Sequence, residues 1–179
     1  MIFLMQLGFT MLECGIVREK NSSNILLKNL LDTCVGALAF YAIGYGFSVE
    51  ADGGIIGTKY FFATGFDSIR FLEWSFYFTY CSTCATIVSG SLAERTYLDT
   101  YLIFSFMMTA FIYPVVASWV WGDGWLQRIG FIDCAGSGAI HMLGGACGFV
   151  GAYLLGPRKG FYKDMKENKK FDLKKLISA

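Results

Sequence analysis

The chain has 179 residues, of which 55% are hydrophobic, 17% aromatic and only 16% charged. A soluble domain is closer to half apolar and a quarter charged, so this composition and a mean hydropathy of +0.48 exclude an ordinary water-soluble domain. The net charge of +1 is uninformative by itself, and we expect no nucleic-acid partner.

Five apolar segments follow one another along the chain, at roughly 1–16, 29–49, 71–93, 101–121 and 131–155. A helix needs ~20 residues to cross ~30 Å of hydrocarbon, and the last four segments reach that length. The first is shorter, so we expect a first helix truncated at its outer end, and no basic stretch precedes it as a cleavable signal peptide requires. The sequence therefore predicts an all-α integral membrane fold of about five transmembrane helices.

The basic residues predict how these helices are oriented. Eight of the fifteen Lys and Arg residues lie between Arg158 and Lys175. If the turn at 17–28 faces the cytoplasmic-type side, that side collects twelve basic residues against three on the other side. The positive-inside rule then places the N-terminus outside and the C-terminus on the cytoplasmic-type side. We expect two regions, a transmembrane part at 1–156 and a basic tail at 157–179.

Six cysteines raise the question of metal or redox chemistry. All lie in or beside apolar runs, where a thiol packs as a small hydrophobic group, and the C-x-x-C pair Cys81–Cys84 has no second pair or suitably spaced histidine. We expect no metal site and no cofactor. We also expect no enzyme, because no nucleophile–base or phosphate-loop pattern occurs.

Small residues mark the last apolar segment as a helix that packs closely against others. It contains six glycines, and Gly144 and Gly148 form a G-x-x-x-G pair. Pro114 should bend the fourth segment. Asp32 is unsuited to lipid, so we expect it to point into the bundle or to pair near the interface.

His141 is the only histidine, and it lies about ten residues into the last apolar segment. It could be a buried helix histidine that bonds a neighbouring hydroxyl or carbonyl. Because an ionisable side chain in mid-membrane is costly, a functional role is the favoured hypothesis. The residues alone leave that function open.

Aromatic residues gather near the outer ends of the neighbouring segments, including Phe76, Tyr80 and Trp121. An interfacial aromatic belt would explain them. A cup for an ammonium-type cation would also explain them, because ring faces attract such cations by about 0.5–2 kcal/mol each. Composition favours the belt without excluding the cup.

Several stretches together carry a resemblance to a known family. They are "MQLGFTMLECGIVREKN" (5–21), "NILLKNLLDTCVGALAFYAIGYGF" (24–47), "CATIVSGSLAER" (84–95), "YLIFSFMMTAFIYPVVASWVWGDGWL" (101–126) and "GFIDCAGSGAIHMLGG" (130–145). In this order and spacing the chain resembles the ammonium transporter (Amt/Mep/Rh) family over about 150 residues. The resemblance covers the first five-helix repeat only, whereas members usually carry two inverted repeats with the pore between them.

The resemblance implies roles for individual residues. His141 corresponds to the first of two pore histidines. Trp121 and Phe76 correspond to aromatics of the outer vestibule, and Asp133 to an aspartate that supports the outer substrate site. Tyr80 falls where many members have a phenylalanine gate, and its hydroxyl is a departure from the family pattern.

Three functions are compatible with half of such a transporter. The first is ammonium or ammonia transport as part of an assembled pore, with another polypeptide supplying the second wall. The second is a transport-inactive accessory subunit of a larger membrane complex, and the third is a membrane sensor module that uses His141. All three imply a lipid bilayer and other membrane subunits as partners, and the family implies association of copies into oligomers. The resemblance favours the plasma membrane, with an organelle membrane such as the mitochondrial inner membrane as the alternative.

Overall fold

The computed structural model describes residues 2–162, and every regular element among them is helical. Short 3₁₀ and π turns, labelled η, extend or join the α-helices. The elements are α1 (Ile2–Ile16), η1 (Glu19–Asn21), α2 (Ser22–Ala39), η2 (Phe40–Gly44), α3 (Tyr45–Ser48), η3 (Phe61–Ala63), α4 (Ser68–Leu92), α5 (Leu98–Met107), η4 (Met108–Ile112), α6 (Tyr113–Trp121), α7 (Trp125–Arg128), η5 (Ser137–Met142) and α8 (Leu143–Leu155).

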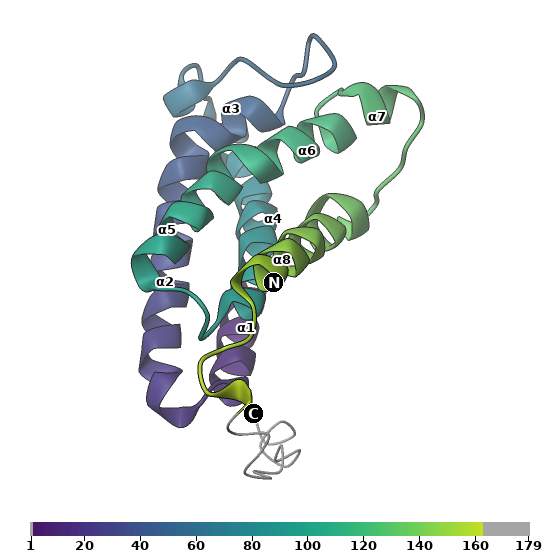
Figure 1. Ribbon diagram of the computed structural model, residues 1–179. Coiled ribbons are helices and arrows are strands. Elements are labelled where there is room, and N and C mark those ends of the chain that lie inside the picture. Colours follow the sequence, from purple (N-terminus) through teal and green to yellow (C-terminus); the bar gives the residue numbers. More distant parts are fainter. Residues whose placement is uncertain (1, 163–179) are drawn as a thin grey trace.

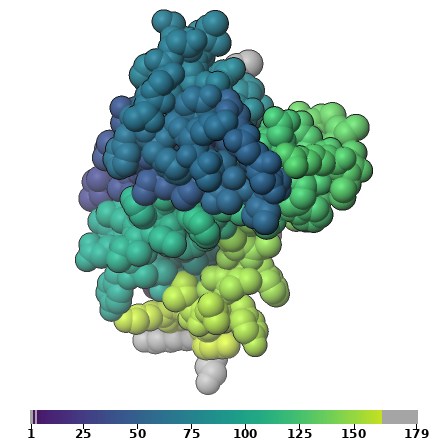
Figure 2. All heavy atoms as spheres, turned by 90° about the horizontal axis from the view of Figure 1, so that it is seen from above, coloured from purple at the N-terminus to yellow at the C-terminus, as the bar shows by residue number. Residues whose placement is uncertain are grey.

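The helices run between two ends of an elongated bundle (Figure 1). The α1–α2 turn lies at the lower end of the view, the α4–α5 link lies in its lower half, and the chain after α8 descends toward the same end. The α3–α4 link and α7 lie at the upper end, and Figure 2 shows the region around α7 projecting to one side. The expected basic tail falls mostly on residues 163–179, outside the described residues.

Three helices among residues 2–162 are long and apolar enough to cross a membrane: Glu19–Ser48, Leu98–Arg128 and Ser137–Leu155. A shorter apolar helix covers Leu4–Ile16. The 25-residue helix α4 carries serine and threonine side chains that are buried inside the bundle, and this lowers its hydropathy. The predicted all-helical membrane fold is therefore confirmed in class, with the helices arranged around α4.

Two of the long helices contain a π turn in their middle. In α2–α3 it is η2, and in α5–α6 it is η4, which ends two residues before Pro114. A proline cannot donate to the preceding turn, and a π turn is one way to accommodate the carbonyl left free. Between these two π turns, Gly44 of η2 lies close enough to the backbone carbonyl of Thr109 that a side chain there would collide with it.

The core of the bundle is built from tyrosine, cysteine and small side chains packed around α4. Tyr45, Tyr101 and Tyr113 are among the largest fully buried side chains. Cys81 and Cys84 are also buried and unpaired, so they pack as small hydrophobic groups.

The side chains of Lys28 and Glu94 are buried and form ion pairs. Lys28 was counted among the solvated basic residues, but it is buried and forms an ion pair of 3.1 Å with Glu13. Glu94 and Arg95 do not pair with each other. Arg18 and Arg158 bind Glu94 at 3.0 and 2.7 Å, and Asn21 also donates a hydrogen bond to it.

Glu94 therefore joins three segments at the lower end of the bundle: the α1–α2 turn, the end of α4 and the segment after α8. Its side chain is only 3% exposed. Burial by itself raises the pKa of this carboxyl, but the hydrogen bonds from Arg18, Asn21 and Arg158 outweigh it and lower the pKa to about 2. Glu94 is therefore a charged anchor at neutral pH.

Candidate functional site

Three aromatic residues from two helices form a continuous row at the upper half of the bundle. Phe76 and Tyr80 lie four residues apart on one face of α4, and their ring centroids are 4.7 Å apart in an edge-to-face arrangement. The ring of Tyr80 lies 5.8 Å from that of Trp121, the last residue of α6. The structure thus brings together the three aromatics that the resemblance singled out.

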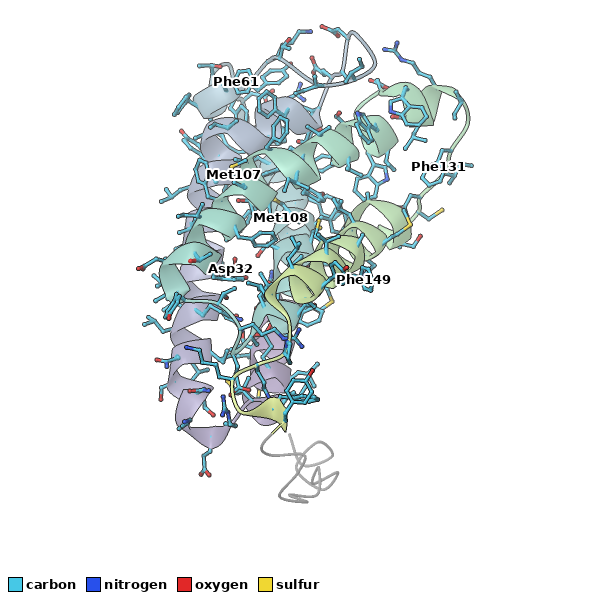
Figure 3. All side chains as sticks on the ribbon, viewed as in Figure 1. Asp32, Phe61, Met107, Met108, Phe131 and Phe149 are labelled. Carbon is cyan, nitrogen blue, oxygen red and sulfur yellow. The ribbon has the colours of Figure 1, made fainter. Side chains whose placement is uncertain are left out.

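Trp121 links this row to Asp133. Its indole N–H donates a hydrogen bond of 2.9 Å to the backbone carbonyl oxygen of Asp133. Phe131 and the other residues of the connecting segment lie between α7 and η5 (Figure 3). This bond therefore fixes the end of α6 to the segment that leads into the last helix.

The carboxylate of Asp133 caps the N-terminus of that helix. Its Oδ1 accepts backbone N–H groups of Gly136 and Ser137 at 2.8 and 2.9 Å, and its Oδ2 accepts those of Gly138 and Ala139 at 2.9 Å each. The first N–H groups of a helix have no partner within it, and a carboxylate at this position also favours the helix dipole. Gly136 has a φ of +82°, a left-handed conformation that the turn before the helix requires.

These bonds keep Asp133 ionised. Burial alone raises the pKa of Asp133, but the four backbone N–H groups outweigh it and lower the pKa below its usual value. Because both carboxylate oxygens are already occupied, a cation beside the aromatic row would meet ring faces rather than this carboxylate. Asp133 thus stabilises the loop and the start of the last helix.

His141 belongs to the π turn η5 that follows this cap. Its backbone N–H and that of Ile140 both donate to the carbonyl of Gly136, at 3.0 Å. Its side chain is exposed on the described bundle. π turns within helices occur frequently at functional sites, because they alter which side chains point in one direction.

The last helix begins later than expected. Hydropathy placed the start of the last segment at Phe131, but the helix begins at Ser137, so His141 is its fifth residue. The cap formed by Asp133 explains the difference, because apolar residues before a cap belong to the loop. The signal was present in the spacing: an aspartate three residues before a glycine–serine–glycine run is typical of a helix N-terminus.

The rest of the last helix, α8, is held against α4 by small residues. A Cβ atom on Gly144 would lie 3.0 Å from Cβ of Ile87, and one on Gly148 would lie 2.6 Å from Oγ of Ser91. The two glycines of the G-x-x-x-G pair thus face α4 and allow close approach.

The opposite side of α8 is uncovered within the described residues. Met142, Phe149 and Tyr153 are 70%, 73% and 79% exposed, and Figure 3 shows Phe149 on this side. We call this side of η5 and α8, with His141 at its upper end, the His141 face. Across residues 2–162, no three His, Cys, Asp or Glu side chains gather in a way that could hold a metal ion.

Comparisons with known proteins agree with the fold. The family model described as "Ammonium Transporter Family" matches residues 1–179. The chain is 43% identical to "Ammonium transporter Amt2" of Archaeoglobus fulgidus over 175 residues, which are 90% of this chain and 37% of that protein. It is also 43% identical to "Ammonium transporter 1 member 3" of Solanum lycopersicum over 172 residues, with coverage of 89% and 37%.

A solved structure supports the same family and fold. The "Sensor Amt Protein" superposes with a TM-score of 0.84 at 37% sequence identity, over 88% of this chain and 42% of that chain. This chain thus spans well under half the length of the relatives it matches. On these grounds the chain belongs to the ammonium transporter family.

Proposed function

We propose that this chain forms one wall of a transmembrane pathway for ammonia and ammonium, and that protein outside these 179 residues supplies the second wall. The observation that carries the proposal is the position of His141. It is an exposed, ionisable side chain on an otherwise apolar helix face. Asp133 caps the same helix and is bonded to Trp121 of the aromatic row.

The chemistry of the substrate explains such a face. An unpaired ion in an apolar medium carries a Born penalty of the order of tens of kcal/mol, whereas ammonia is small and neutral. Aromatic faces at the entrance attract the ammonium ion by about 0.5–2 kcal/mol each. An imidazole further along can accept a hydrogen bond from ammonia or exchange a proton with it, while apolar neighbours exclude ions.

The exposure of the His141 face supports a second wall of protein. Apolar residues such as Phe149 could lie against lipid, but an imidazole facing lipid would be costly. A covering of protein would place His141 in a lined passage instead. The lengths of the relatives leave room for such a covering, since this chain matches 37% of two of them.

The same proposal includes an orientation of the bundle in the membrane. The α1–α2 turn, the α4–α5 link and the segment after α8, toward the lower end of the bundle, carry Arg18, Lys20, Arg95, Arg158 and Lys159. The α3–α4 link, the start of α4 and α7, at the upper end, carry Lys59, Arg70 and Arg128. By the positive-inside rule the lower end faces the cytoplasmic-type side, and the aromatic row then faces outward. We propose the plasma membrane as the location, as the family suggests.

Radiolabelled methylammonium uptake tests the proposal. The chain alone in proteoliposomes should take up no more than protein-free liposomes, and vesicles of the membrane that contains it should show uptake that competes with ammonium. Robust flux through the chain alone would contradict the need for a second wall. No uptake in either preparation would favour an accessory subunit.

A sensor is the second candidate, because the matched solved structure is named "Sensor Amt Protein". In that case ammonium should change the conformation of the assembled protein without net uptake. Ammonium-dependent quenching of Trp121 fluorescence in the absence of flux would identify this function. Uptake that depends on His141 would exclude it as the sole function.

A further inference from the structure

Glu73 lies on α4, at the upper end of the aromatic row, and the function proposed above gives it no role. It precedes Phe76 by three residues and Tyr80 by seven, so all three side chains project from one face of the helix. At a rise of about 1.5 Å per residue, Glu73 is about 4.5 Å from Phe76 and about 10 Å from Tyr80 along the helix axis. A carboxylate therefore stands where a cation from outside would first meet the row.

Glu73 is also the last member of a chain of ion pairs in the α3–α4 link and the first turns of α4, at the upper end of the bundle (Figure 1). Lys59 pairs with Asp52 and Glu50, at 3.0 and 3.3 Å. Arg70 pairs with Glu50 and Glu73, at 3.2 and 3.4 Å. Three carboxylates thus share two basic side chains, and one negative charge is left without a matching positive charge in this chain of ion pairs.

The carboxylate of Glu73 is only partly occupied. Arg70 and the hydroxyl of Tyr45 both approach its Oε2, each at 3.4 Å. Within residues 2–162 its Oε1 accepts no hydrogen bond, and the side chain is 46% exposed. Partly exposed ion pairs of this kind contribute little to stability. Glu73 can therefore attract a further cation without losing a contact on which the fold depends.

The other carboxylate beside the row is not available in the same way. Both oxygens of Asp133 accept backbone N–H groups at the start of the last helix. Its charge is committed to that cap, whereas the charge of Glu73 is directed toward solvent at the outer end of the row. Of these two carboxylates, Glu73 is the one that can meet an incoming cation.

We propose that Glu73 recruits the ammonium ion to the outer end of the aromatic row, a role that rests on the function proposed above. A charge acts in water over a Debye length of about 10 Å at 0.1 M salt, which is also about the distance from Glu73 to Tyr80. The carboxylate thus raises the local concentration of cations along the row, and the ring faces then bind the ion. Because this step precedes passage along the His141 face, it should affect KM and not the maximal rate.

A purely structural role for Glu73 leads to a different expectation. If Glu73 only held Arg70 in place, substitution of either residue would disturb the α3–α4 link, and both substitutions would change KM in the same direction. If Glu73 acts by its charge, its loss raises KM, whereas the loss of Arg70 lowers KM, because Arg70 offsets part of that charge. The two variants therefore separate the two roles by the sign of the effect.

Uptake of radiolabelled methylammonium by the assembled protein, measured against its concentration, tests the role. Glu73→Gln keeps the size of the side chain and removes its charge. We expect KM to rise about threefold at ~0.01 M salt and to differ by less than about 1.5-fold at ~1 M salt, where the Debye length is only about 3 Å. The maximal rate should stay the same, and Glu73→Asp, which keeps the charge, should restore most of the affinity.

Two further variants complete the comparison. Arg70→Gln should lower KM by about twofold at low salt. Asp99→Asn removes the same charge from an exposed position at the start of α5, at the opposite end of the bundle, and should leave KM as it is in the wild type. Unfolding temperatures of all variants show whether any of them alters the fold.

An equilibrium titration separates this role from transport itself. Methylammonium should quench the part of the tryptophan fluorescence that Trp121→Phe abolishes, with a midpoint about threefold higher in Glu73→Gln, whether or not net uptake occurs. A shifted midpoint without any uptake would contradict transport and support recruitment by Glu73. Uptake that depends on His141 but has the same KM in Glu73→Gln would overturn recruitment and leave the proposed function in place. Equal midpoints, no cation-dependent quenching in the wild type, or a KM that rises in Arg70→Gln as well would also overturn recruitment.

Discussion

The indole N–H of Trp121 and the backbone carbonyl of Asp133 are joined by a hydrogen bond of 2.9 Å. Trp121 ends α6, and Asp133 caps the helix that carries His141. This one hydrogen bond therefore links the position of the aromatic row to that of His141. A substitution at Trp121 should alter the structure at the start of η5.

Trp121→Phe should weaken both stability and uptake. The lost hydrogen bond costs about 1 kcal/mol. The smaller ring weakens attraction for the cation by about 0.5–1 kcal/mol, which corresponds to a roughly twofold to fivefold loss of methylammonium uptake at low concentration. Chemical unfolding in micelles and uptake by the assembled protein measure the two effects.

Trp119→Phe is the matched control for that variant. Trp119 donates an equivalent hydrogen bond of 2.8 Å to the carbonyl of Ile55, away from η5. It should lose similar stability and keep its uptake. Equal uptake in the two variants would show that Trp121 does not contribute to the pathway.

Glu94→Gln should destabilise the lower end of the bundle by about 2 kcal/mol at neutral pH, because Arg18 and Arg158 lose a charged acceptor. The folded-state pKa of Glu94 is about 2, below its unfolded value of about 4.3. Its contribution is thus complete above pH ~4.3 and is lost as the pH falls toward 2. Unfolding temperatures of wild type and variant should converge over that range.

The exposed Glu19 lies in the same turn region and provides the control. Glu19→Gln should leave the acid dependence of unfolding as it is in the wild type. A constant gap between wild type and Glu94→Gln from pH 7 to pH 2 would show that Glu94 does not act through its charge.

Gly144→Ala should cost about 1–3 kcal/mol of stability, because its Cβ would press against Ile87 and the carbonyl of Cys84 at 3.0 and 3.1 Å. Gly145→Ala is the matched control. No atom lies within 4 Å of its Cβ, and alanine is the better helix former, so this variant should be neutral or slightly more stable. Equal stability of the two variants would mean that α8 is not held closely to α4.

Asp133→Asn should destabilise the start of the last helix by about 2 kcal/mol, because an amide offers one acceptor oxygen where the carboxylate offers two. Two of the four backbone N–H groups then lose their partner. Hydrogen exchange at Gly136, Ser137, Gly138 and Ala139 measures the effect directly. Unchanged protection at all four would contradict the capping role.

The fold could be predicted largely from hydropathy. Apolar runs of about 20 residues fix where helices cross a bilayer, since backbone groups there must bond within the helix. The same method missed the start of the last helix by six residues. Hydropathy does not distinguish Phe131 in a loop from an apolar residue in a helix, whereas the cap formed by Asp133 does.

The buried charges could not be located in the same way. Lys28 has the sequence context of a basic loop next to a helix, yet it is buried with Glu13. Such a pair depends on the contact between α1, α2 and α4, which brings together residues 61 positions apart such as Lys28 and Ser89. Contacts of this kind follow from the packing of helices and leave no local pattern in the sequence.

The residues of the site were predicted from the family resemblance and not from a local sequence pattern. The resemblance singled out Phe76, Tyr80, Trp121 and Asp133, and the structure brings these four together. Their functional roles, and that of His141, remain predictions.

Methylammonium uptake by the assembled protein, compared between His141→Ala and Met142→Ala, tests the central claim most directly. Both residues lie in η5 and are exposed on the described bundle, but only one carries a nitrogen that can bind ammonia. The account predicts that uptake falls at least tenfold, about 1.4 kcal/mol, in His141→Ala and is retained in Met142→Ala. Equal uptake in the two variants would contradict a pathway along this face.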